Sequence, residues 1–122
     1  MGGAHRVYFG GDGGYHPGFV EIGRRLGPFD LTMLEIGAWH PSWASIHRGP
    51  EKALVAHRDL SGRLLLPIHW GTFNLAIHSW DEPIETLLAG AGSLGGGLVL
   101  PRIGELACLR QPPPLAAWWR RR

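Results

Sequence analysis

A single carboxylate among glycines is the first feature of this sequence that could do chemistry. Asp12 stands in Gly10-Gly11-Asp12-Gly13-Gly14, directly after an apolar stretch that ends at Phe9. Glycines let a backbone pass close to a bound ion, and a carboxylate at the carboxyl end of a strand can face a cleft. The alternative is a glycine-rich turn in which Asp12 only hydrogen-bonds neighbouring amides, and this is the preferred interpretation of the peptide taken alone.

A histidine much later in the chain changes that preference. His69 follows directly on the apolar stretch Leu64-Leu65-Leu66-Pro67-Ile68 and opens the sequence His69-Trp70-Gly71-Thr72-Phe73. On its own it could be a buried imidazole that serves the core. Paired with Asp12 at another strand end, a shared metal site is the better explanation, because Asp oxygen and His nitrogen are common zinc ligands. Catalytic zinc takes three protein ligands, so these two would be an incomplete set.

A second group of polar residues precedes a predicted helix. His47 and Arg48 stand just before Gly49-Pro50-Glu51, and a helix N-terminus, a histidine and an arginine all favour anions such as phosphate. We predict a substrate contact here, with a solvated histidine near the helix cap as the alternative. His40 is a further candidate in the preceding loop, whereas His57 falls at an ordinary helical position and is expected to be structural. The sequence has no serine nucleophile elbow and no phosphate-binding loop of the Gly-x-x-x-x-Gly-Lys type.

The elements that must position these residues alternate along the chain. Apolar patterns and stop signals predict strands at residues 6–9, 29–36 and 63–68, helices at 16–26, 50–60 and 81–88, and two short closing strands at 98–100 and 103–109. Residues 37–48 have no clean period and are expected to form a long functional loop. This alternation is typical of an α/β fold with a largely parallel or mixed sheet, in which ligands gather at the carboxyl ends of the strands.

Composition limits the classes of protein that remain. The 122 residues, 44% of them apolar, fit one domain with a modest core. The formal charge is +2, but Arg120, Arg121 and Arg122 contribute three positive charges, which leaves −1 for the rest and argues against a nucleic-acid-binding face. The single Cys108 excludes an internal disulfide and suits a reducing compartment. We find neither a membrane-span pattern nor a signal peptide, and expect a soluble, cytoplasmic protein.

Three motifs in order resemble one family. They are Gly11-Asp12-Gly13-Gly14-Tyr15, His47-Arg48-Gly49-Pro50-Glu51-Lys52-Ala53 and His69-Trp70-Gly71-Thr72-Phe73, with Gly27-Pro28-Phe29-Asp30-Leu31 and Ile36-Gly37-Ala38 between them. Over residues 6–109 the chain resembles the metallo-β-lactamase-fold hydrolases of the N-acylphosphatidylethanolamine phospholipase D and ascorbate-lactonase-like branch. The resemblance implies an αββα sandwich with one or two metals, usually zinc, that activate water to attack a phosphodiester, phospholipid or lactone-type ester.

The resemblance also assigns roles to residues. Asp12 matches the metal-bridging Asp of the family and His69 its last metal-ligand His, so both are expected to bind metal. His47 matches a histidine on the substrate side of the cleft and is the expected catalytic residue. Arg48, His40 and Tyr15 are expected to contact the substrate.

The departures from the family pattern limit what the chain can do alone. The His-x-His-x-Asp-His motif, which supplies most metal ligands, does not occur here, and in the family it belongs to the first half of the sandwich. We therefore expect residues 1–110 to form the C-terminal half of the sandwich, a mixed sheet with helices packed on one face. Half a sandwich exposes the inner face of its sheet, so we expect pairing with a separate N-terminal half, or self-association, and no turnover by the chain alone.

Two alternatives stay open at this point. The chain could be a non-catalytic interaction module or remnant that uses the exposed sheet for pairing. The Pro/Trp/Arg segment 111–122 is expected to be a disordered tail outside the domain. Contact with a membrane surface or nucleic acid through Trp118, Trp119 and the arginines is the less favoured alternative.

Overall fold

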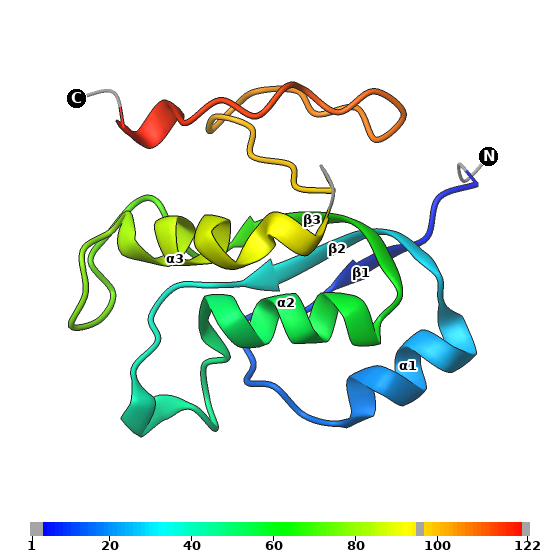
Figure 1. Cartoon of the computed structure of the whole chain (residues 1–122), viewed down its shortest axis with the longest axis horizontal. Helices are drawn as coiled ribbons and strands as arrows, with labels where there is room; N and C mark the ends of the chain where they lie inside the picture. Colours follow the sequence, from blue (N-terminus) through cyan, green and yellow to red (C-terminus); the bar gives the residue numbers. More distant parts are fainter. Residues whose placement is uncertain (1–3, 95–96, 121–122) are drawn as a thin grey trace.

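Parallel strands and the helices that connect them make up the fold (Figure 1). The computed structural model describes residues 4–94 and 97–120. The strands β1 (Val7–Phe9), β2 (Phe29–Glu35) and β3 (Gly62–Ile68) form a sheet in the order β1-β2-β3, with both pairings parallel. The helix α1 (Gly18–Leu26) connects β1 to β2, α2 (Gly49–Asp59) connects β2 to β3, and α3 (Glu82–Gly90) follows β3. The predicted α/β class is confirmed, and these pairings are parallel where the family resemblance implied a mixed sheet.

One face of the sheet carries the main core. Alternate side chains of the strands, among them Leu34, Ile36 and Leu65, point to this face and are fully buried. The helices cover them with the apolar residues Phe19, Ala53, Leu54, Ala56, Ile84 and Leu87. The helices pack on this one face, as predicted. The strand residues that alternate with the buried ones point to the other face.

The other face of the sheet is only partly covered. The strand register aligns Val7, Leu31 and Leu64 in one row and Phe9, Met33 and Leu66 in the next. The segment from residue 97 to 109 covers part of these rows with Val99, Ala107 and Leu109. Val7 and Phe9 at the β1 edge remain 49% and 66% exposed.

The two predicted closing strands are the main error in the element assignment. Leu98 forms only an isolated parallel bridge with Leu65. Residues 103–109 form no strand, because a turn interrupts them: Glu105 donates its backbone N–H to the Arg102 carbonyl, and its carboxylate accepts the Arg102 N–H at 2.7 Å. Pro101 contributes no N–H to a ladder, and Gly104 takes a left-handed φ of 85°. The turn and the proline together prevent strand pairing.

Residues 111–120 belong to the domain, which corrects the expectation of a disordered tail outside it. Trp119, in the short 3-10 helix Trp118–Arg120, is 3% exposed and packs into the main core. Its indole Nε1 donates to Glu85 Oε1 of α3 at 2.8 Å, and Arg120 binds the same carboxylate. Large aromatic side chains bury enough area to hold a proline-rich segment against the core. Arg121 and Arg122 lie outside the described residues. Among residues 4–94 and 97–120, none of the helices is both long and apolar enough to cross a membrane.

Candidate functional site

The carboxyl ends of neighbouring strands meet at one edge of the sheet, as parallel topology requires. Glu35 is the last residue of β2 and His69 follows the last residue of β3. His47 comes from the loop that leads into α2, which begins two residues later. Because β2 and β3 pair directly, a side chain at the end of one strand lies next to a side chain at the end of the other.

A buried carboxylate and two imidazoles form the centre of this edge. Glu35 is fully buried, and its Oε2 lies 3.0 Å from His47 Nδ1 and 3.6 Å from His69 Nδ1. Its second oxygen, Oε1, accepts the backbone N–H of Arg48 at 3.0 Å. The two imidazole rings stack with their centroids 5.8 Å apart and their planes 20° from parallel. About a fifth of the His47 side chain and a third of the His69 side chain remain exposed, 21% and 32%.

The backbone segments that follow β2 and β3 pass close to one another at this point. An added Cβ on Gly37 would stand 1.9 Å from the carbonyl oxygen of His69, so only glycine fits here. The Ile36 N–H donates to the Ile68 carbonyl at 3.1 Å and extends the pairing up to the site. His69 itself has a left-handed φ of 64°, which non-glycine residues adopt mostly where the surrounding structure demands it. The glycine and this turn together direct the His69 imidazole to Glu35.

The donor set fits a divalent transition metal. Glu35, His47 and His69 each offer a ligand atom, and these atoms lie within 4.8 Å of one another. Imidazole nitrogen and carboxylate oxygen suit zinc and similar ions. The Nδ1 atom of His69 is buried without a hydrogen-bond partner, so the imidazole is not fully satisfied by the protein around it.

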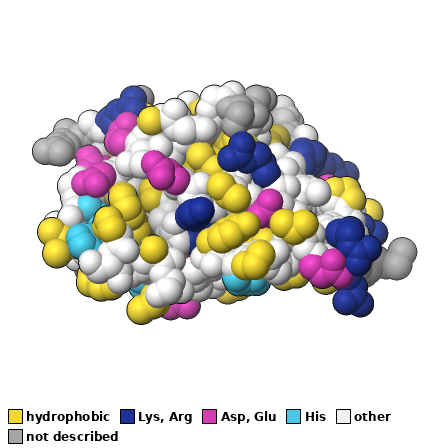
Figure 2. Space-filling view, turned by 60° about the horizontal axis from the view of Figure 1, so that its bottom comes forward, with side chains coloured by type: hydrophobic (Ala, Val, Ile, Leu, Met, Phe, Trp, Pro, Cys, Tyr) yellow, Lys and Arg dark blue, Asp and Glu magenta, His cyan; other side chains and the backbone are white. Residues whose placement is uncertain are grey.

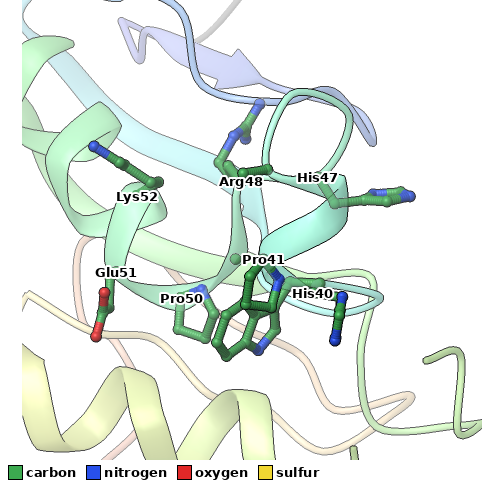
Figure 3. Close-up of a pocket in the computed structure, with 10 residues that line it drawn as sticks. His40, Pro41, His47, Arg48, Pro50, Glu51 and Lys52 are labelled. Carbon is green, nitrogen blue, oxygen red and sulfur yellow. The ribbon is translucent and has the colours of Figure 1, made fainter. Parts of the chain in front are cut away.

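Arg48 stands beside the cluster but directs its charge elsewhere. In Figure 3 the side chains of Arg48 and His47 point in different directions. The Arg48 guanidinium is buried, lies over the Phe19 ring and reaches the carbonyl of Gly14 at 3.5 Å. Burial lowers the pKa of this guanidinium, while the nearby Glu35 carboxylate acts in the opposite direction. Arg48 thus supports the glycine loop that carries Asp12.

The remaining predicted residues lie around the cluster. Asp12 is exposed on the glycine loop after β1 and is not among the three clustered side chains. His40 accepts the Ser42 N–H at 3.2 Å, and with His47 it lines a cavity of about 120 Å³ beside the start of α2 (Figure 3). The hydroxyl of Tyr15 donates to Asp59 Oδ2 at 2.7 Å, at the last residue of α2, and this bond raises the pKa of Tyr15. His57 is buried and its Nδ1 lies 2.7 Å from Thr32 Oγ1, as a structural histidine would.

Glu35 is the residue that the sequence analysis missed. It stands in Leu31-Thr32-Met33-Leu34-Glu35-Ile36, where a charged residue interrupts an apolar strand. A carboxylate that ends a buried strand needs partners. That signal could have identified it without the structure.

Apolar side chains are exposed on both loops that flank the two histidines. On the first loop Trp43 and Ile46 are 37% and 59% exposed, and on the second Phe73, Leu75 and Ile77 are 70%, 45% and 84% exposed. The second loop forms a groove of about 310 Å³ lined by His69, Trp70, Thr72, Phe73 and Leu75. In Figure 2 histidine and hydrophobic side chains lie next to one another at the left end of the molecule, where Figure 1 places the loop before α2.

Comparison with known proteins identifies a matching family model and several longer relatives. Residues 1–70 match the model of a beta-lactamase superfamily domain. An uncharacterized protein of Mycobacterium tuberculosis is 47% identical over 119 residues, which are 95% of this chain and 32% of that protein. The N-acyl-phosphatidylethanolamine-hydrolyzing phospholipase D 1 of Caenorhabditis elegans is 42% identical over 86 residues, 67% of this chain and 24% of that enzyme. The chain therefore spans about a third or less of the length of these relatives.

A solved structure supports the fold. Igni18, a metallo hydrolase from the archaeon Ignicoccus hospitalis, superimposes with a TM-score of 0.59 over 84% of this chain and 40% of that chain, at 24% sequence identity. The family match covers more than half of the residues, and it agrees with the three ordered motifs in the sequence. The chain belongs to the beta-lactamase superfamily and has the α/β fold of the metallo-β-lactamase-type hydrolases.

Proposed function

We propose that this chain is part of a metal-dependent hydrolase that uses metal-activated water to cleave a phosphodiester, phospholipid or lactone-type ester. The observation that carries the proposal is the grouping of His47 and His69 on one buried carboxylate at the carboxyl ends of the parallel strands. Ligand and catalytic sites of α/β folds lie at such ends. The phospholipase D relative of Caenorhabditis elegans supports the choice of substrate class.

Each residue has a role in this proposal. His69 and Asp12 would be metal ligands, with further ligands from a part of the protein that corresponds to the unmatched length of the relatives. When bound, zinc would polarise a water molecule and lower its pKa towards neutrality. His47 would hold or transfer a proton at its Nε2, facing the substrate. His40 and Arg48 line the cavity next to His47. We assign His40 to substrate binding, and Arg48 to support of the glycine loop that carries Asp12 and Tyr15.

The exposed apolar side chains favour a substrate with an apolar part. Phe73 and Leu75 lie in the groove beside His69, and Ile46 immediately precedes His47. An acyl chain in this groove would cover apolar surface that otherwise faces water. A phospholipid is therefore the preferred substrate within the proposed class.

The test uses the 122-residue chain, the part of the Mycobacterium tuberculosis relative outside the matched region, and the two co-expressed, each with added zinc. The substrates are bis(p-nitrophenyl) phosphate, a γ-lactone and vesicles that contain an N-acylated phosphatidylethanolamine. We expect hydrolysis only from the co-expressed pair, its loss in His69→Ala, and a decrease of about 10²-fold or more in His47→Ala. The exposed Glu82→Gln is the matched control and should leave the rate unchanged.

Two results would contradict the proposal in different ways. If the co-expressed pair, shown to be folded and associated, hydrolyses none of the substrates, the hydrolase assignment fails. If the 122-residue chain by itself turns over a substrate with zinc and loses that activity in Asp12→Ala, the expectation that the chain is inactive alone fails.

The partly covered sheet face favours a second candidate function, that of a non-catalytic interaction module that pairs with another half or with itself. Val7 and Phe9, 49% and 66% exposed, leave the β1 end of this face open. Size-exclusion chromatography with light scattering tests self-association. A dimer that Phe9→Glu converts to monomer, while Val20→Glu on the exposed surface of α1 does not, would support pairing through the sheet. A monomer at all concentrations would exclude self-association.

A further inference from the structure

We propose that Glu35 is a positioning residue whose Oε2 accepts the Nδ1–H of both His47 and His69, so that the Nε2 of each imidazole is its reactive atom. The inference rests on the proposed function in one respect, namely that the two imidazoles serve as metal ligand and proton carrier. It concerns which nitrogen of each ring is protonated, and that property exists in the metal-free chain. It therefore has a test of its own.

The burial of Glu35 demands partners, and each neighbouring nitrogen can act as a donor. A fully buried carboxylate without hydrogen bonds is very costly. Oε1 receives the backbone N–H of Arg48 at 3.0 Å, and Oε2 lies 3.0 Å from His47 Nδ1. A carboxylate accepts several hydrogen bonds at once. Oε2 therefore has the capacity for a second imidazole N–H.

His69 is the remaining donor. Its Nδ1 is buried, has no hydrogen-bond partner and lies 3.6 Å from Glu35 Oε2. That separation exceeds the ordinary N···O distance of about 2.9–3.0 Å by about 0.6 Å, and catalytic hydrogen bonds are commonly long before ligand binds and shorten afterwards. Closing this contact would satisfy the orphaned nitrogen and fix the His69 ring at the same time.

The arrangement leaves both Nε2 atoms free on the side away from the carboxylate. The two nitrogens of an imidazole point in widely different directions, so a ring with Nδ1 towards Glu35 turns Nε2 away from it. The two ring planes lie 20° from parallel with their centroids 5.8 Å apart, so the two imidazoles stand next to one another beside Glu35. Metal-binding histidines normally donate their other N–H to a carboxylate or carbonyl, which matches the place of Glu35.

Direct metal binding by Glu35 is the competing explanation, and it makes the opposite prediction. The three ligand atoms lie close enough for it. If Oε2 and both Nδ1 atoms held the metal together, each Nδ1 would have to be unprotonated and each Nε2 would carry the hydrogen. The nitrogen that stays protonated when zinc is bound therefore separates the two explanations, and the metal-free tautomers test the hydrogen bonds to Glu35.

The experiment is long-range ¹H–¹⁵N NMR with ¹⁵N-labelled histidine, at a pH where the imidazoles are neutral, on the metal-free 122-residue chain and on the co-expressed complex with zinc. We expect His47 and His69 as Nδ1–H tautomers in the wild type. In Glu35→Gln the side chain keeps one acceptor oxygen and gains an amide donor, so at least one of the two should change to Nε2–H. Glu82→Gln should change neither, and His57 serves as an internal reference.

The second measurement is the affinity for zinc, determined in competition with a chelator. If the chain or its co-expressed complex binds zinc, Glu35→Gln should weaken the affinity by about 10- to 100-fold. Nε2–H tautomers at both histidines in the wild type would overturn the proposal, as would Nδ1–H tautomers that persist at both in Glu35→Gln. The wild-type spectra, metal-free and with zinc, test the tautomers even if the variant does not fold. Nδ1–H tautomers without zinc binding or hydrolysis would refute the proposed function and leave the role of Glu35 intact.

Discussion

Replacement of Gly37 by alanine should damage the fold and the site through a single contact. The added Cβ would lie 1.9 Å from the His69 carbonyl oxygen, whereas real Cβ contacts essentially never fall below 3.0 Å. The backbone after β3 must therefore move by about 1 Å or more. Gly37 has no left-handed φ, so the cost is steric, and overpacking of this kind typically costs about 1–3 kcal/mol.

Urea denaturation and NMR test this prediction together. For a domain of this size a loss of about 2 kcal/mol lowers the unfolding midpoint by about 1 M urea. The displaced His69 should lose its approach to Glu35, so its imidazole resonances should shift more than those of His57. Gly92→Ala is the matched control, because nothing lies within 4 Å of a Cβ there. If Gly37→Ala unfolds within about 0.5 kcal/mol of the wild type and leaves the His69 resonances unchanged, the reasoning from close backbone contact is refuted.

Three further predictions concern the core and its titrating groups. Trp119→Ala should lower the free energy of unfolding by about 3–5 kcal/mol, because a buried indole is removed; a loss below 1 kcal/mol in urea denaturation would show that residues 111–120 are not held to the domain. Hydrogen bonds from Arg120 and then Trp119 hold the pKa of Glu85 at about 2, below its ordinary 4.5, so stability is complete above pH 4.5 and falls as pH drops towards 2; acid titration of Glu85→Gln should lack this loss. Burial and the adjacent Arg58 lower the pKa of His57 to about 4 from 6.5, so protonation favours the unfolded chain and stability should fall by about 3 kcal/mol from pH 6.5 to 4. His57→Gln should remove this slope, and an unchanged slope would contradict the assignment.

Local patterns in the sequence predicted most of the fold. The three strands and three helices were predicted within one or two residues at most ends, because apolar periodicity, prolines and glycines near helix ends act over a few residues. The prediction of a closing strand at residues 103–109 was wrong because it, too, relied on a local pattern. Its apolar residues resemble a strand, but a turn at residues 102–105 stops pairing, and Glu105 closes that turn from within the predicted strand.

The sequence by itself determined which residues end the strands, and it placed His69 at a strand end, where α/β folds bind their ligands. Three ordered motifs also placed the chain in its superfamily. Only the tertiary structure decided which of those residues meet. Glu35, His47 and His69 are separated by long stretches of chain, and the direct pairing of β2 with β3 and the packing of α2 bring them together. Trp119 is buried for the same reason, because its partners lie on α3 and in the main core. Contacts between distant segments depend on strand order and close packing, and no local pattern encodes either of these.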